Sequence, residues 1–218
     1  AAASGDTISF ASLLFDTPQT IQTNGQLTIN KTLIINGRGS NLTTVQNVAP
    51  QSATSRVFFV DPTGNLTLSN LTVTGGNLPS GNFGGGILNR NLLTVIGCQI
   101  SGNFIAGVSN GGGITAGLPL SSDTPTTLIS NSTISGNQSQ IGGGIYTRAG
   151  NATVINSTVS GNQATSGGGG FYHTIGTLNI VNSTITANST TVGGGISVDS
   201  NSTVMLRNSI VAQNIASI

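Results

Sequence analysis

Three consecutive glycines followed by a large apolar residue occur five times in this chain, and this repeat constrains its fold more than any other feature. The apolar residues that close the motifs are Ile87, Ile114, Ile145, Phe171 and Ile196, at intervals of 27, 31, 26 and 25 residues. A repeat of this length is one structural unit that buries its apolar face by stacking on its neighbours. The Pro and Ser content of the longest interval predicts a loop inserted near residues 116–126.

Apolar residues alternate with other residues within each repeat, which predicts short strands with one buried face. When the repeats are aligned, three columns are almost entirely apolar. The first column is Leu68, Val95, Ile129, Val154, Ile180 and Leu206; the second is Val73, Ile100, Ile134, Val159, Ile185 and Val211; the third is Leu66, Leu93, Thr127, Ala152, Leu178 and Val204. About three such strands fit in one repeat, so we expect a parallel β-helix whose coils stack at about 4.8 Å.

Asparagine forms two further columns. One is Asn70, Asn131, Asn156, Asn182 and Asn208, with Gly97 in one repeat; the other is Asn103, Asn137, Asn162, Asn188 and Asn214. Asn tolerates the left-handed conformation of tight turns, and stacked amides can hydrogen-bond along the helix axis. The Gly triplets suit positions where φ is positive or where coils approach closely.

Only 5% of the 218 residues are charged, and the net charge is +1. Identical charges stacked at the coil spacing would repel one another, so uncharged polar columns suit a solenoid surface. This composition gives no electrostatic footprint for nucleic acid. No apolar run is long enough to span a membrane as a helix.

The segment Asn-Ser-Thr-Ile-Ser-Gly-Asn of residues 131–137, followed by Gly-Gly-Gly-Ile-Tyr of residues 142–146, resembles the repeats of bacterial right-handed parallel β-helix proteins of the pectin-lyase-like superfamily. It is also similar to the polymorphic outer-membrane protein repeats of bacterial surface proteins. Those repeats carry aromatic-x-x-Asn where this chain has Ile/Val-x-x-Asn. The resemblance covers about residues 24–214 and implies a right-handed coil. It is specific for fold rather than for function, because the superfamily includes adhesins, autotransporter passengers and polysaccharide lyases.

The expected fold is therefore all-β: a single-stranded right-handed parallel β-helix (β-solenoid) of about six to seven coils. Residues 24–218 form the repeats as one domain, and residues 1–23 form an N-terminal cap with a short helix near residues 12–15 and then a strand. No charged or Pro-bearing closing element follows Asn214, so we expect the last coil to be open. Open sheet edges tend to pair with other chains.

We expect a secreted structural protein, not an enzyme and without a cofactor, whose subunits stack head to tail into an extracellular fibre or surface layer. The expected assembly contacts are Phe10, Leu13, Leu14, Phe15, Ile210, Ile215 and Ile218. The alternative is a monomeric carbohydrate-binding adhesin or autotransporter-like surface domain, so glycans are the second expected class of partner. The Ala-Ala-Ala-Ser of residues 1–4 resembles the product of a signal peptidase and favours a secreted or cell-surface location.

The carboxylates do not form a pair suited to catalysis. Asp61 and Asp199 fall at one corner of the repeat but about five coils apart, roughly 24 Å, whereas glycosidases need carboxylates about 5–9.5 Å apart. Arg90 is expected beside Asp61 on the adjacent coil, close enough for a surface ion pair, and Asp123 is expected alone in the inserted loop. His173 is expected as an exposed turn residue, and no cluster of His, Cys and carboxylates predicts a metal site. A hydrolase or polysaccharide lyase is therefore disfavoured.

Few other side chains indicate chemistry. Cys98 is expected to fill the core as a small inward residue, since its column otherwise holds Leu71 and serines. The aromatic residues of this region are expected at turns or as partly exposed packing groups: Tyr146, Phe171 and Tyr172. They would provide at most a small platform for sugar stacking.

An outward Thr/Ser array flanks the second apolar column. Its members are Thr133, Ser135, Thr158, Ser160, Thr184 and Thr186. Flat arrays of this kind resemble those of ice-binding β-solenoids, but Thr also has high strand propensity and pairs well between neighbouring strands. Gln99 interrupts the array, which favours the structural role. Eleven Asn-x-Ser/Thr sequons occur, several of them in stacked columns where a glycan would obstruct the next coil.

Overall fold

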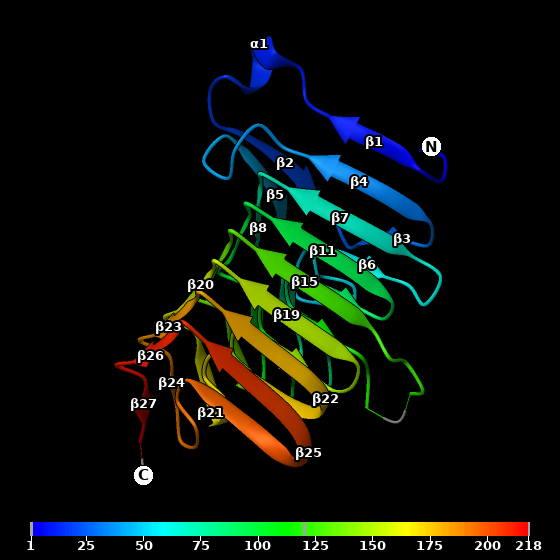
Figure 1. Cartoon of the computed structure of the whole chain (residues 1–218). Helices are drawn as coiled ribbons and strands as arrows, with labels where there is room; N and C mark the ends of the chain where they lie inside the picture. The colour runs from blue at the N-terminus through cyan, green and yellow to red at the C-terminus, as the bar shows by residue number, and fades with distance from the viewer. Residues whose placement is uncertain (1, 120, 218) are drawn as a thin grey trace.

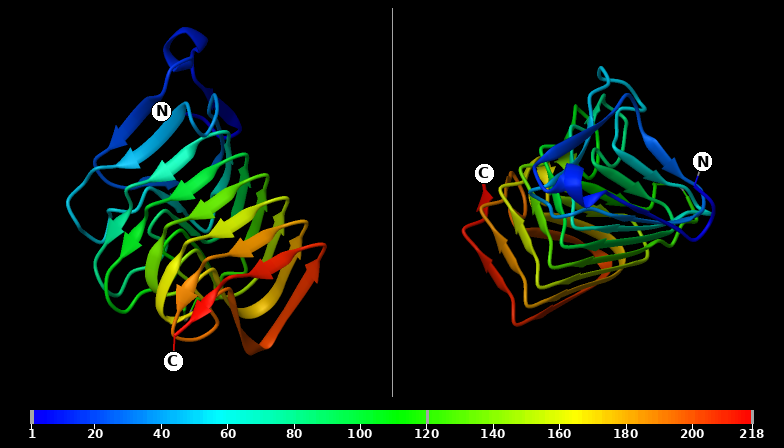
Figure 2. Two further views of the ribbon diagram at one scale, coloured as in Figure 1. Left: turned by 90° about the vertical axis from the view of Figure 1, so that its left-hand side faces the viewer. Right: turned by 90° about the horizontal axis from the view of Figure 1, so that it is seen from above.

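Strands at equivalent positions of successive repeats pair in parallel and build a stack of coils (Figure 1). The computed structural model describes residues 2–119 and 121–217. Three parallel sheets, here called A, B and C, wind through about eight turns. The two chain ends lie at opposite ends of the stack (Figures 1 and 2).

Sheet A has 13 strands in two rows that join at the C-terminal end. The first row is β1 (Asp6–Ser9), β4 (Thr32–Asn36), β7 (Asn65–Ser69), β11 (Leu92–Ile96), β15 (Thr126–Ser130) and β19 (Asn151–Ile155). The second row is β3 (Leu27–Ile29), β6 (Phe58–Val60), β10 (Ile87–Asn89), β14 (Ile114–Ala116) and β18 (Ile145–Thr147). Both rows continue into the long strands β22 (Phe171–Val181) and β25 (Ile196–Arg207).

Sheets B and C complete each turn. Sheet B contains β2 (Gln19–Thr23), β5 (Thr43–Asn47), β8 (Thr72–Thr74), β12 (Gln99–Ser101), β16 (Thr133–Ser135), β20 (Thr158–Ser160), β23 (Thr184–Thr186) and β26 (Ile210–Ala212). Sheet C contains β9 (Asn77–Leu78), β13 (Phe104–Ile105), β17 (Gln138–Ile141), β21 (Gln163–Gly167), β24 (Ser189–Thr190) and β27 (Ile215–Ala216). The helix α1 (Ser12–Phe15) lies between β1 and β2.

The all-β parallel β-solenoid predicted from the repeats is confirmed, with about eight turns instead of six to seven. The sequence count was low because the glycine marker first appears at residue 84, whereas strands β1 and β2 already pair with the next coil at β4 and β5. The residues near 12–15 form the expected short helix, and a strand follows it.

The three apolar columns are confirmed by the strand register. Val95 pairs with Leu68 and Ile129, and the same column continues to Leu206. Along the middle of the solenoid these side chains point inward and form one continuous core. The fold is therefore stabilised by burial of these apolar side chains between stacked coils.

The two Asn columns have different roles. The first column lies on the surface, with φ between 47° and 55°, so Asn supplies the left-handed turn between sheets A and B. The second column, here called the Asn ladder, consists of Asn103, Asn137, Asn162, Asn188 and Asn214. Each Nδ2 of its first four members donates to the Oδ1 of the next member at 2.9–3.0 Å. The ladder joins five successive coils at the turn between sheets B and C.

A second polar column runs beside the core at Cys98. The backbone N–H groups of Cys98, Ser132, Ser157 and Ser183 each donate to the hydroxyl of the next serine at 3.1 Å. Cys98 is buried as expected, and burial raises the pKa of its thiol to about 11. The small size of these residues thus serves hydrogen bonding between coils as well as packing.

Candidate functional site

The C-terminal coil leaves the apolar core uncovered at its end. Val204, Leu206 and Val211 continue the three inward columns, yet Leu206 is 49% exposed and Val211 46% exposed. Together with Val198 and the glycines at 193–195 they line a hollow of about 460 Å³. No described segment covers this hollow, so β25 and β26 present both apolar side chains and unpaired strand edges.

The N-terminal end presents apolar side chains on α1. This short helix projects beyond β1 at the other end of the stack (Figure 1). Leu13 is 96% exposed and Leu14 59% exposed. Phe15 instead turns inward, and its ring lies 4.7 Å from that of Phe10, centroid to centroid. The helix therefore uses Phe15 to attach itself to the solenoid and leaves Leu13 and Leu14 free.

The predicted assembly residues fall into two groups. Leu13 and Leu14 are accessible, whereas Phe15 is buried and Phe10 packs against the core. At the other end Ile210 and Ile215 are exposed but belong to outward columns, beside Thr184 and Ser189 respectively. Ile218 lies outside the described residues, as do Ala1 of the N-terminal segment and Leu120 of the inserted loop.

The sequence prediction missed the side chains that form the floor of the C-terminal hollow. Val204, Leu206 and Val211 were already the last members of the three aligned columns. The last member of an inward column has a neighbouring coil on one side only. Its place at the end of the column therefore indicated, from the sequence alone, that it would be left uncovered. The predicted contacts Ile210 and Ile215 are instead outward-facing residues of the C-terminal coil.

The Thr/Ser array lies in parallel register on the outer side of sheet B. Thr133, Thr158 and Thr184 pair directly in neighbouring coils. Thr44 and Thr72 extend the same row toward the N-terminus, and Gln99 separates them from the rest. Pairing of neighbouring Thr side chains within the sheet remains our prediction for this surface.

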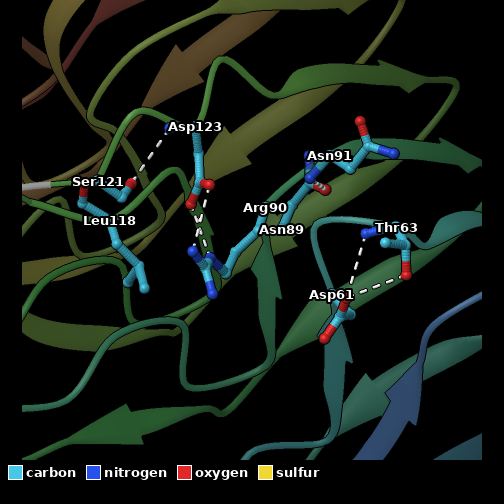
Figure 3. Close-up of polar contacts among 8 residues, drawn as sticks. All are labelled: Asp61, Thr63, Asn89, Arg90, Asn91, Leu118, Ser121 and Asp123. Atoms are coloured by element: carbon cyan, nitrogen blue, oxygen red, sulfur yellow. Dashed lines mark hydrogen bonds and ion pairs between the residues drawn. The ribbon is translucent and has the colours of Figure 1, made fainter.

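The ion pair expected between Asp61 and Arg90 is not formed. Arg90 Nε donates to Asp123 Oδ2 at 2.7 Å, and its Nη2 donates to Asp123 Oδ1 at 3.2 Å (Figure 3). Asp61 turns away and accepts hydrogen bonds from the backbone N–H and hydroxyl of Thr63, both at 3.1 Å. The expectation that Asp123 stands alone was wrong because the inserted loop folds back over the corner. The bidentate pair attaches this loop to the solenoid.

His173 is buried, not exposed as expected. It lies in β22 and pairs with Thr147, the last residue of β18, in a column that is also buried at Asn89 and Ala116. Its Nδ1 is hydrogen-bonded with the Thr147 hydroxyl, and its Nε2 has no partner among the described residues. No carboxylate in the described part of the chain is hydrogen-bonded to this imidazole, and the Thr147 hydroxyl is buried with it, so the geometry does not indicate acid–base catalysis.

Burial of His173 makes stability depend on pH. Burial lowers the pKa of the imidazole below its ordinary value, and the nearby Gly176 backbone and the charge of Asp199 oppose this only in part. As pH falls, the unfolded chain binds a proton that the folded chain does not yet bind, so the free energy of unfolding decreases from about pH 6.5 downward. Urea unfolding at about pH 7.5 and about pH 5 will measure this loss.

The control for this prediction is His173→Gln, which keeps a neutral polar side chain. This is the single His of the chain, so the variant has no imidazole left to titrate. We expect its stability to change less than that of the parent between the two pH values. An equal loss in both chains would contradict the assignment to His173.

The aromatic residues are more enclosed than expected. Phe171 and Tyr146 are buried, and Tyr172 stacks on Tyr146 with ring centroids 6.0 Å apart. The Tyr172 hydroxyl donates to Asp199 Oδ1 at 2.9 Å. Tyr146 is buried and Tyr172 is only partly exposed, which leaves little surface for sugar stacking.

Other kinds of site receive no support from the geometry. Within residues 2–119 and 121–217 no group of three His, Cys, Asp or Glu side chains could hold a metal ion. The same residues contain no helix long and apolar enough to cross a membrane. Comparison with protein-family models, with curated proteins and with solved structures finds no match to this chain.

Proposed function

We propose that the protein is a structural subunit that stacks head to tail into an extracellular fibre or surface layer. The observation that carries this proposal is the uncovered apolar hollow of the C-terminal coil. Exposed apolar side chains that end a continuous core favour a partner that continues the core. A copy of the same chain supplies strands of the required direction, because every coil in the stack is parallel.

The two ends of the stack match in chemistry. The column that ends at Leu206 begins at Ile8, and the column that ends at Val211 begins at Ile21. The exposed Leu13 and Leu14 of α1 add further apolar surface at the N-terminal end. Contact of one copy's hollow with the next copy's N-terminal end buries apolar surface on both sides. Because the two surfaces differ, the contact is heterologous and repeats without closing, which generates a filament.

The family and location form part of the same proposal. The repeat motif supports membership of the right-handed β-helix proteins of the pectin-lyase-like superfamily. Only 5% of the residues are charged, so amides and hydroxyls make up most of the polar surface. This surface supports a role outside the cell in which subunits meet by stacking rather than by electrostatic attraction.

The contact is tested from its N-terminal side by Leu14→Asp. A carboxylate buried in the hollow would lose its hydration without a partner, so we expect this variant to form no fibres. Negative-stain electron microscopy and sedimentation velocity of the 218-residue chain measure assembly. The matched control is Val108→Asp: Val108 is 67% exposed on the side of the solenoid, and this variant should assemble like the parent. Fibres formed by Leu14→Asp would overturn the contact.

A complementary variant tests the other side. Val211→Asp disables the hollow but leaves α1 intact, whereas Leu14→Asp leaves the hollow intact. Each variant alone should be monomeric, and an equimolar mixture should give heterodimers that grow no further, because the pair contains one working contact. A mixture that stays monomeric would exclude the head-to-tail geometry.

A further inference from the structure

One hollow on the side of the solenoid lies over sheet C. It measures about 750 Å³ and is lined by five successive coils, from Phe104 to Ser217. It reaches the C-terminal coil at Ser217 but shares no described lining residue with the hollow at the end of the stack. The outward residues Phe104, Gln138, Gln163 and Ser189 form one row along the sheet, since they pair directly in parallel register.

A second row forms the opposite wall of this hollow. It contains Gln140, Thr165 and Thr191, each two residues beyond a member of the first row. The register between β17 and β21 shifts after Ser139, and such a shift bends the bulged strand locally. Two rows with a strand floor between them make a groove directed along the axis of the stack.

The groove combines one aromatic face with side-chain amides. Phe104 is 41% exposed although it is a large apolar residue, and Val108 is exposed beside it. The side-chain amides of Gln138, Gln140 and Gln163 make no hydrogen bond within the part of the chain that the structure describes. These three amides therefore offer donors and acceptors to a ligand without breaking a contact of the fold.

None of the described residues that line the groove is charged. Anionic polymers such as nucleic acids and polyuronates need cationic partners and are disfavoured here. A neutral polysaccharide needs apolar faces for its ring C–H groups and amides or hydroxyls for its hydroxyl groups. The groove supplies both, in rows that repeat at about 4.8 Å along the stack.

We infer that this groove binds a linear neutral polysaccharide, with its chain along the solenoid axis and one sugar ring against Phe104. The straight floor of parallel strands suits a flat extended glycan, such as a β-1,4-linked glucan, better than a helical one. The amides of Gln138 and Gln163 then hydrogen-bond to hydroxyl groups of successive sugars. This role goes beyond the proposed fibre and does not require it.

Isothermal titration calorimetry tests the inference with three probes: cellohexaose, maltohexaose and hexagalacturonate. The chain used carries Leu14→Asp, so that assembly and binding are measured separately. We expect cellohexaose to bind with Kd below about 1 mM, maltohexaose more weakly, and hexagalacturonate not at all. Failure of the fibre proposal leaves this experiment unaffected.

Variants in the groove locate the binding. Phe104→Ala should raise Kd for cellohexaose about fivefold or more, and the pair Gln138→Ala with Gln163→Ala about tenfold. These side chains are on the surface, so the melting temperature should stay that of the parent. Thr158→Ala on sheet B is the matched control and should leave Kd unchanged.

The inference is overturned by absence of cellohexaose binding, by equal binding of maltohexaose, or by preferred binding of hexagalacturonate. It is also overturned if Kd for cellohexaose is the same in the groove variants and the parent. Binding that the groove variants lose and the sheet B control retains is the supporting result.

Discussion

Replacing Asn162 with Ala is expected to lower the free energy of unfolding by about 3–5 kcal/mol. Asn162 is fully buried within the Asn ladder. Its Oδ1 accepts from the backbone N–H and from the Nδ2 of Asn137, both at 3.0 Å. Its Nδ2 donates to the Ile134 carbonyl and to Asn188 Oδ1, both at 2.9 Å. Alanine removes these four hydrogen bonds in a buried turn and leaves the backbone N–H of Asn137 without its acceptor. The cost of an unpaired buried polar group is about 1–3 kcal/mol.

Asn156→Ala provides the matched control, because Asn156 lies six residues earlier in the same coil. Asn156 is exposed and has φ of 49°, so its replacement costs only the left-handed strain, about 1 kcal/mol. Urea unfolding followed by circular dichroism measures both variants. Similar losses for the two variants would show that the ladder contributes no more than the turn conformation of Asn.

The strand columns were predictable because stacking makes each coil repeat the environment of its neighbour. Val95, Ile129 and Val154 occupy the same inward position, so the alignment of repeats is also an alignment in space. The Asn ladder was predictable for the same reason. The burial of the Asn ladder was not evident, because the two Asn columns look alike in the sequence. In the structure only the exposed column has positive φ.

The two mispredicted residues differ in their relation to the repeat. His173 pairs with Thr147, which is buried at the end of β18, so its burial follows the repeat even though the neighbouring residues indicated a turn. Arg90 could be aligned with Asp61 of the preceding coil, yet its partner Asp123 comes from a loop that has no counterpart in other repeats. Periodicity carries information only about residues that every coil possesses.

The uncovered side chains of the C-terminal coil could be inferred only in part. The alignment makes Val204, Leu206 and Val211 the last members of their columns, but it does not show how far they are exposed. Leu206 and Val211 belong to columns that are buried throughout the middle of the solenoid, and their exposure arises solely from their place in the last coil. The proposed contact therefore depends on position in the stack rather than on any motif.

Gly143→Ala is expected to lower the free energy of unfolding by about 3 kcal/mol or more. Gly143 is the second glycine of its triplet, and its φ is not positive, so the constraint on it is steric. A Cβ at this position would lie 2.6 Å from the carbonyl carbon of Gln163 and 2.7 Å from the carbonyl oxygen of Gly169. Both are backbone atoms of the next coil, and they cannot move away without separating paired strands. The same displacement would also disturb the hydrogen bond from the Gly143 N–H to the Gly168 carbonyl, now 3.1 Å.

Gly136→Ala separates this steric effect from the general cost of replacing glycine. Gly136 has φ of 62°, but a Cβ added there would meet no atom within 4 Å, so alanine costs only conformational strain, about 1 kcal/mol. Urea unfolding midpoints and melting temperatures of the two variants give the comparison. A Gly143→Ala chain as stable as Gly136→Ala would mean that neighbouring coils can separate locally at little cost. Close stacking of the glycine triplets would then not explain why the large apolar residue of each motif stands only after its triplet.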